Sequence, residues 1–565
     1  MILLLAVTSF GILLSLLYGW MLEFAAVKFL KLNEDHDLYF SITILSGLAL
    51  LSGLLGIWSF YHGIGTRAVV FFLLLALLSL IVTWKYVFVR LEILAQQLKS
   101  LSVLSWLFFV ASTIFALYIA AASSPTYDTG LYHAQAIRWI ENFRVVPGLA
   151  NLHIRFGFNS NIFLLAAFWG LAGFGWHLYQ VSGLIIFLCM ILYGLYLAEK
   201  LRKGLTFGGI AALGFFIWLL FNGRVISWLA SPATDLPAAL ITWLIFLLAF
   251  EKVEAGNKQL DLHLIAIVIL CLFDVTIKLS SLPILLIPIY FLWEARASFS
   301  LKNAIALVIL SSAVFLSWVA RNVVLTGYLL FPFAQLDIFR FDWKVPPESV
   351  KQITEIITSW ARIPYLDFNL VLFMPLGQWL PIWYQALSAN DSFLLVGILV
   401  GIIPLIILIA VDKETARKVR SYTPVYAVSI VGAVFWFAQS PSPRFGYGFL
   451  VPLLLFLYTP FIALLLELVK YSRGWFALIA QSLLTILVLI AVIRIPLKSW
   501  EHYMNLVTPY PQVVTRTVNL GSQTLFIPVS GDQCWYDAFP CTPSEISGLA
   551  MRESSLQDGF YISQK

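Results

Sequence analysis

The stretch MILLLAVTSFGILLSLLYGWML, Met1–Leu22, decides the fold class, because it is a nearly uninterrupted apolar run. A helix needs about 20 apolar residues to cross the roughly 30 Å hydrocarbon layer of a bilayer. No basic region precedes this run, so we expect an uncleaved span rather than a signal peptide. Similar runs recur along all 565 residues, of which 61% are hydrophobic and 11% charged. The sequence therefore predicts an all-α polytopic membrane protein.

Working outward from this run, we predict about fourteen transmembrane helices. They are expected at 2–22, 40–60, 68–88, 101–121, 177–198, 205–221, 235–250, 262–279, 281–295, 301–319, 393–411, 424–439, 446–468 and 474–495. The apolar segment 159–173 is too short for a comfortable crossing, so we expect it to lie in the interface or to re-enter.

The positive charges are distributed unequally between alternate loops. Seven short loops carry 17 Lys or Arg residues, namely 26–37, 90–100, 199–204, 251–261, 294–302, 412–420 and 470–474. The short loops on the other side carry three arginines, Arg67, Arg224 and Arg444. The positive-inside rule then predicts a multi-pass protein with both termini external. The net charge of +6 reflects these scattered loop residues, so no nucleic-acid partner is expected.

Three external regions are long enough to carry function. They are the loop 122–176, the loop 336–392 with its amphipathic helices, and a small tail at 496–565. The tail contains Cys534 and Cys541, which could pair as a disulfide in an oxidising space or remain as free thiols.

The first external loop contains the polar stretch SSPTYDTGLYHAQAIRWIENFRVVPG, Ser123–Gly148. A helix that begins at Asp128 would place Tyr132, Gln135 and Trp139 on the face of that carboxylate. A neighbouring apolar face could lie on lipid; it consists of Ala136, Ile137, Ile140 and Phe143. Asp128 could act as a general base, stack with a sugar, or cap the helix, and these roles can coexist. His133 lies between the two faces and has either a structural or a site role.

Further ionisable residues stand at the outer ends of predicted spans. Asp235 is either a helix cap or a site residue, and Lys278 either neutralises Asp274 one turn earlier or binds phosphate. Arg321 and Arg444 could each snorkel to the interface. If the three cations converge, they would instead form a phosphate or pyrophosphate site.

These motifs resemble the GT-C-type integral membrane glycosyltransferases, a class that includes protein O-mannosyltransferases and aminoarabinose transferases. The resemblance covers roughly residues 101–335 and is to a bacterial branch of the class, which implies that the protein lies in a bacterial inner membrane. The matching pieces are SSPTYDTGLYHAQAIRWIENFRVVPGL, NSNIFLLAAFWGLAGFGWHLYQVSGL, SPATDLPAALITWLIFLLAF, DVTIKLSSLPILLIP and RNVVLTGYLLFPF. Residues 101–335 would then form a catalytic core, preceded by three accessory spans in 1–100 and followed by C-terminal spans in 393–495.

The resemblance implies an inverting transfer of a sugar from a polyprenyl-phosphate-linked donor to a glycan, lipid or protein acceptor. Asp128 would be the general base. Lys278, Arg321 and Arg444 would bind the lipid phosphate, and Tyr132, His133, Arg138 and Asp235 would complete the substrate site. This chain has one carboxylate where the class often has two adjacent ones, so no metal site is predicted and a divalent metal is left open.

Two other functions fit the composition. A transporter or lipid flippase suits the number of spans, although we find no internal repeat. An O-antigen ligase or polymerase would use arginine and histidine in a large external loop, but residues 320–392 contain no histidine. Membrane lipids are partners under all three hypotheses.

Overall fold

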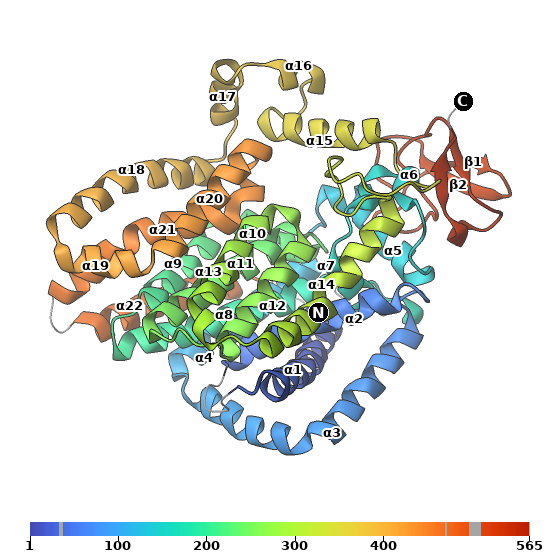
Figure 1. Ribbon diagram of the computed structural model, residues 1–565. Coiled ribbons are helices and arrows are strands. Elements are labelled where there is room, and N and C mark those ends of the chain that lie inside the picture. Colours follow the sequence, from blue (N-terminus) through green and yellow to red (C-terminus); the bar gives the residue numbers. More distant parts are fainter. Residues whose placement is uncertain (33–37, 469–471, 497–509, 564–565) are drawn as a thin grey trace.

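The computed structural model describes residues 1–32, 38–468, 472–496 and 510–563. Parts of the predicted loops 26–37 and 470–474 and of the predicted tail 496–565 lie outside these ranges. Long apolar helices form one body, and the short helices of the predicted external loops gather at one end of it with the tail (Figure 1).

The all-α polytopic class is confirmed. Within the described ranges, eleven helices are long and apolar enough to cross a membrane, or twelve if a pair bent by 66° counts as one span. The bent pair is α19 (Lys413–Ser421) with α20 (Thr423–Gln439), and the eleventh and last of the long helices is α22 (Ser472–Ile493). The other long elements are α1 (Ile2–Leu30), α2 (Phe40–Trp58), α3 (Thr66–Lys99), α4 (Val103–Ala122), α8 (Val181–Lys203), α11 (Asp235–Ala255), η5 (Leu279–Leu285) with α13 (Leu286–Glu294) and η6 (Ala295–Ser298), α14 (Leu301–Thr326), α18 (Ala389–Val411) and α21 (Pro443–Leu468).

The two remaining predicted spans are helical but shorter. They are α9 (Phe207–Phe221) and α12 (Leu262–Ile277). Every one of the fourteen predicted segments thus overlaps a helix, while the count of helices long enough to span is eleven or twelve.

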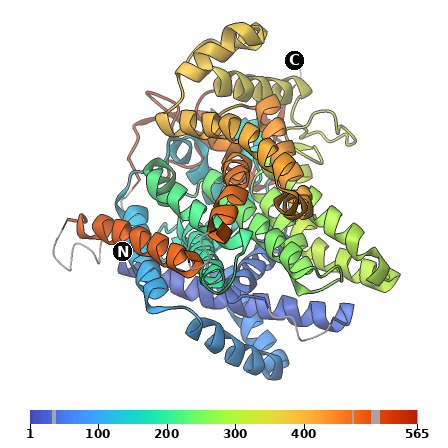
Figure 2. The ribbon, with the colours of Figure 1, turned by 90° about the vertical axis from the view of Figure 1, so that its left-hand side faces the viewer.

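Helix α2 lies inside the helical body because its glycines permit close approach. A Cβ at Gly47 would overlap the carbonyl oxygen of Ser15 on α1, and one at Gly53 would overlap that of Ala313 on α14. Small residues at such contacts let helix backbones pack closely where apolar burial alone gives no preference over lipid. In contrast, α3 lies along the lower edge of the body in both views (Figures 1 and 2) and exposes about half of its apolar side chains.

Short helices build the end of the body that is predicted to be external. The first loop contains η1 (Thr129–His133), α5 (Ala134–Asn142), α6 (Leu149–Leu152), η2 (Ile154–Gly157), α7 (Asn161–Trp169) and η3 (Ala172–Phe174). The later segments are α10 (Gly223–Ser227), η4 (Trp228–Ala230), α15 (Pro347–Arg362), α16 (Phe368–Phe373) and α17 (Leu376–Gln385). All nine residues of α7 are buried, so the short apolar segment predicted at the interface is packed inside the protein.

The tail forms a small β-structure. Strand β1 (Thr515–Leu520) pairs antiparallel with β2 (Gln523–Pro528), and β3 (Leu549–Met551) with β4 (Phe560–Ile562). A short 3₁₀ turn, η7 (Leu556–Asp558), precedes β4. Cys534 and Cys541 form a disulfide in the connection between the two sheets.

One expectation about the first loop is wrong. The apolar face of α5 was expected on lipid, yet Ala136 and Ile137 are buried in the protein core, because α5 packs against α7. The opposite side of α5 is covered by the tail, which bonds to Gln135 and Arg138.

Candidate functional site

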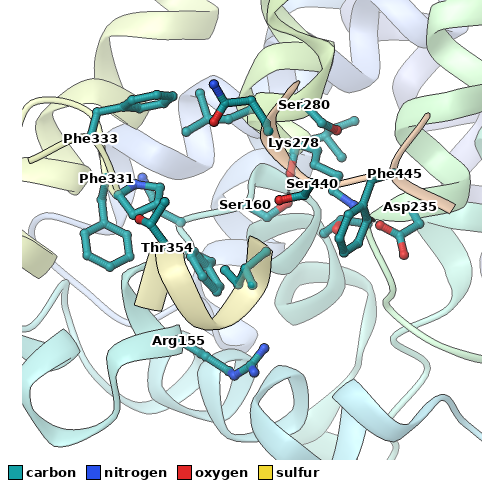
Figure 3. Close-up of a pocket in the computed structure, with 18 of the residues that line it drawn as sticks. Arg155, Ser160, Asp235, Lys278, Ser280, Phe331, Phe333, Thr354, Ser440 and Phe445 are labelled. Carbon is teal, nitrogen blue, oxygen red and sulfur yellow. Dashed lines mark hydrogen bonds and ion pairs between the residues drawn. The ribbon is translucent and has the colours of Figure 1, made fainter. Parts of the chain in front are cut away.

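A cavity of about 1250 Å³ lies where the loop 122–176, the adjoining ends of several long helices and α15 meet. Figure 3 shows Asp235, Lys278 and Phe445 together on one side of it, Phe331 and Phe333 on the other, and Arg155 apart from both. Its volume slightly exceeds the 300–1,000 Å³ that is typical of ligand pockets. The cavity is therefore large enough for a sugar and part of a lipid.

Asp128 faces this cavity instead of capping a helix. It already has helical backbone angles, φ −63° and ψ −22°, and its side chain makes no capping hydrogen bond to a described residue. The backbone then continues as the single π-turn η1, which carries Tyr132 and His133 into the same cavity. Single π-turns are frequent at functional sites because they redirect side chains.

Four charged residues form a continuous chain along one wall. Lys278 makes an ion pair with Asp235. Nε of Arg444 lies 3.8 Å from Oδ2 of Asp235, and Nη1 of Arg444 lies 3.4 Å from Oδ2 of Asp128. The other three residues come from elements far apart in the sequence: Asp235 from the start of α11, Lys278 from directly after α12, and Arg444 from the start of α21.

Positive and negative charges alternate along these four side chains, which together carry no net charge. Asp235 contacts both cations and its side chain is 13% exposed, whereas the Asp128 side chain contacts one cation and is 25% exposed. Asp128 is thus the more accessible of the two carboxylates.

Aromatic rings surround the cations. Nζ of Lys278 lies 4.1 Å from the ring centroid of Phe445, and the Arg444 guanidinium lies 4.8 Å from the rings of both Phe445 and Trp360. Cation–π contacts of this kind hold a cation in place without neutralising it. Since Trp360 belongs to α15, this helix is tied directly to the charged wall.

Tyr132 and His133 are buried at the cavity surface. Burial lowers the pKa of His133 to about 4, so the imidazole is neutral near pH 7. Its Nδ1 has no hydrogen-bond partner among the described residues. Burial raises the pKa of Tyr132, with the nearby Asp128 carboxylate adding to the effect.

Arg155 is a cavity residue that the sequence did not single out. Its guanidinium lies 5.8 Å from the Tyr132 ring centroid, and no carboxylate in the described ranges pairs with it. It follows His153 in the first loop, where nothing but its position beside a buried segment distinguishes it from other loop arginines. With Arg155 included, four cations and four carboxylates line the cavity, among them Lys351, Glu348 and Glu355 of α15.

Two predicted site residues lie elsewhere. Arg321 is buried behind the cavity wall, where it donates to Asn159 Oδ1 at 3.1 Å and to Ser59 Oγ at 2.5 Å. It positions Asn159, which does line the cavity. Arg138 bonds to backbone carbonyls of the tail, including that of Asp537 at 2.8 Å.

Asp274 does not pair with Lys278. It is fully buried and accepts a hydrogen bond from Thr242 at 2.6 Å. The cavity therefore receives Asp128, Tyr132, His133, Asp235, Lys278 and Arg444. Within the described part of the chain, no cluster of three or more His, Cys, Asp or Glu side chains is arranged to hold a metal ion.

The fold and site define a polytopic α-helical membrane protein with an amphipathic cavity at one end of its helices. Residues 1–451 match a protein family described as a domain of unknown function (DUF8201), and the chain belongs to that family. No curated protein and no solved structure matches the chain.

Proposed function

We propose that the protein is a membrane glycosyltransferase that moves a sugar from a polyprenyl-phosphate-linked donor to an acceptor hydroxyl. The observation that carries this proposal is the position of Asp128, which shares one cavity with Lys278, Arg444 and Arg155. A carboxylate beside cations is the arrangement needed to deprotonate an acceptor while charge develops on a leaving phosphate.

The roles follow from the contacts. Asp128 accepts the proton of the acceptor hydroxyl while the hydroxyl oxygen attacks the anomeric carbon of the donor sugar. The bond between that carbon and the phosphate oxygen breaks in the same step. Lys278, Arg444 and Arg155 stabilise the negative charge of the released polyprenyl phosphate. Asp235 holds Lys278 and Arg444 in position, and the aromatic walls receive the sugar and the first part of the lipid chain.

The charged wall contributes one accessible carboxylate, Asp128, which favours an inverting displacement; Glu348 and Glu355 also line the cavity but belong to α15, where Glu355 pairs with Lys351. A retaining reaction through a covalent intermediate needs a nucleophile close to a second acid–base group. Asp235 is the only other carboxylate of the charged chain, and it is already bound by two cations. In a single displacement, the acceptor and the leaving phosphate occupy opposite faces of the sugar.

The activity is tested with purified protein in proteoliposomes that contain a polyprenyl phosphate bearing a radiolabelled hexose. We expect Asp128→Asn to lower transfer of the label into a membrane-extract acceptor fraction by about 10²–10⁴-fold. Glu553→Gln removes an exposed carboxylate of the tail and serves as the control, with unchanged transfer. Equal transfer by wild type and Asp128→Asn would contradict the proposal, and lipid movement across the vesicle without product would favour a flippase.

The proposal includes a topology. The cavity opens on the external face of a bacterial inner membrane, the chain crosses fourteen times, and both termini are external. The excess of Lys and Arg in alternate loops supports this orientation. We expect a cysteine introduced at Asn519 in the tail to react with a membrane-impermeant maleimide in intact cells, and one at Lys258 to react only after permeabilisation. The reverse pattern would contradict the orientation.

A further inference from the structure

The tail contacts the backbone on both sides of Asp128. Gln533 donates its side-chain N–H to the carbonyl of Tyr127 at 2.9 Å. Two residues after Asp128, the carbonyl of Gly130 accepts the backbone N–H groups of Cys534 at 2.8 Å and Trp535 at 2.9 Å. The Asp128 side chain points the other way, toward Arg444. The tail thus holds the main chain of this turn and leaves the carboxylate in the cavity.

A buried amide strengthens this contact one turn later. The side chain of Gln135 donates to the carbonyls of Trp535 at 2.9 Å and Ala538 at 2.8 Å, and accepts the N–H of Cys541 at 3.2 Å. Gln135 is completely buried, so each of these bonds would leave an unsatisfied polar group if it were broken. Three backbone groups of one tail loop are therefore fixed by a single side chain of α5.

The loop that makes these bonds is closed by the Cys534–Cys541 disulfide. Both sulfurs are buried, and every tail residue that bonds to Gly130 or Gln135 lies within 534–541. Covalent closure restricts the conformations of this loop before it docks, which lowers the entropy lost on ordering it.

We propose that the disulfide loop 534–541 is a positioning element that fixes turn η1, and with it Asp128, in the geometry required for transfer. The catalytic part of this inference rests on the function proposed above; the mechanical part does not. A reactive group that moves by about 1 Å can lose on the order of 10²-fold in rate. Gln135, Cys534, Trp535 and Cys541 are the positioning residues.

Two variants of the full-length protein in proteoliposomes test this inference. Cys534→Ser/Cys541→Ser removes the disulfide without relying on reductant access to buried sulfurs. Gln135→Leu keeps the disulfide and removes the amide that holds the loop. The control is Cys189→Ala/Cys271→Ala, which removes the two buried free cysteines of the helical body.

Hydrogen exchange provides a measurement that is independent of activity. We expect peptides covering 127–136 to exchange at least tenfold faster in both test variants, with α2 and α8 unchanged. We also expect kcat to fall by about 10–100-fold with KM for the lipid-linked donor within about twofold, since the cations that bind phosphate are on other elements.

The outcomes separate the two proposals. Unchanged exchange at 127–136 in both variants would overturn the positioning role, and so would faster exchange throughout the long helices, which indicates a general structural role. Local loosening with unchanged kcat would also overturn it. If exchange is faster at 127–136 alone, but neither wild type nor any variant transfers label, the mechanical role of the loop is supported and the glycosyltransferase function is contradicted.

Discussion

Helix α5 and the hairpin α16–α17, both in regions predicted to be external, are held in different ways. Helix α5 is enclosed, with the tail hydrogen-bonded along one side and α7 packed on another. The hairpin α16–α17 lies at the top of both views (Figures 1 and 2); it packs Trp379 and Trp383 against the body, where Trp383 Nε1 donates to the carbonyl of Pro441 at 2.9 Å, and exposes large apolar side chains on its other face. Phe373 is 82% exposed and Leu370 is 60% exposed.

This difference indicates that α5 is held in one position, whereas the hairpin offers a free apolar face for contact with another surface. Directional hydrogen bonds to buried groups define one position for η1 and α5, because each bond that breaks leaves a polar atom unsatisfied. The hairpin contributes an apolar surface with a single charged residue, Asp367, between 363 and 388. Such a surface suits the interface beside the following long helix α18, where contacts are not directional.

Two glycines provide the sharpest test of the comparison. A Cβ at Gly130 would lie 2.6 Å from the Trp535 indole and 2.9 Å from Nε2 of Gln533, whereas a Cβ at Gly377 on α17 meets nothing within 4 Å. We expect Gly130→Ala to displace the tail loop and lower transfer by about 10²-fold. Gly377→Ala should change neither transfer nor thermal stability beyond about 0.5 kcal/mol.

The measurement is label transfer together with proteolysis of the tail. Gly130→Ala should expose the tail to protease while the helical body remains intact, and Gly377→Ala should match wild type in both assays. A Gly130→Ala protein with a protected tail and full transfer would show that the contact tolerates a shift and does not position Asp128.

Much of the fold could be predicted from the sequence because lipid imposes a simple pattern. Every predicted apolar segment overlaps a helix, and even the fully buried α7 was recognised as too short for an ordinary span. The lengths of the individual helices were predicted less well. Helices α9 and α12 are shorter than a standard span, and the bend between α19 and α20 depends on packing that apolar periodicity does not encode.

The site was partly predictable because ionisable residues are rare in apolar chains. Asp128, Asp235, Lys278 and Arg444 stood out for that reason, and the structure brings them together. Their partners could not be deduced, since Lys278 pairs with a residue 43 positions away rather than with nearby Asp274. The burial of α5 was missed because a helix covered by a distant polar tail has the same amphipathic pattern as a helix on lipid.

The junction between α5 and the tail also contains an ionisable group that is largely buried, whereas Asp367 of the hairpin is exposed. Glu141 accepts hydrogen bonds from the hydroxyls of Tyr179 at 2.8 Å and Tyr536 at 3.4 Å, and Arg138 of the preceding turn lies beside the same tail ring. Burial raises the pKa of Glu141 from 4.5 to about 7, against the opposing effect of these hydrogen bonds and of Arg138.

Because the pKa of Glu141 is raised, docking of the tail depends on pH. We expect this pH dependence to be the smallest of the predicted effects. The folded state binds the proton more tightly than the undocked state, so docking is strongest below about pH 4.5, weakens as pH rises to about 7, and is constant above that value. We expect the opening of residues 534–541, measured by hydrogen exchange, to be about tenfold more frequent at pH 8 than at pH 5.

Comparing wild type with Glu141→Gln at each pH cancels the intrinsic pH dependence of exchange, and the variant should remain docked at both values. The hairpin peptides 368–385 should show no such difference between the two proteins. Equal exchange of the tail in wild type and Glu141→Gln at both pH values would contradict the prediction that ionisation of Glu141 weakens docking.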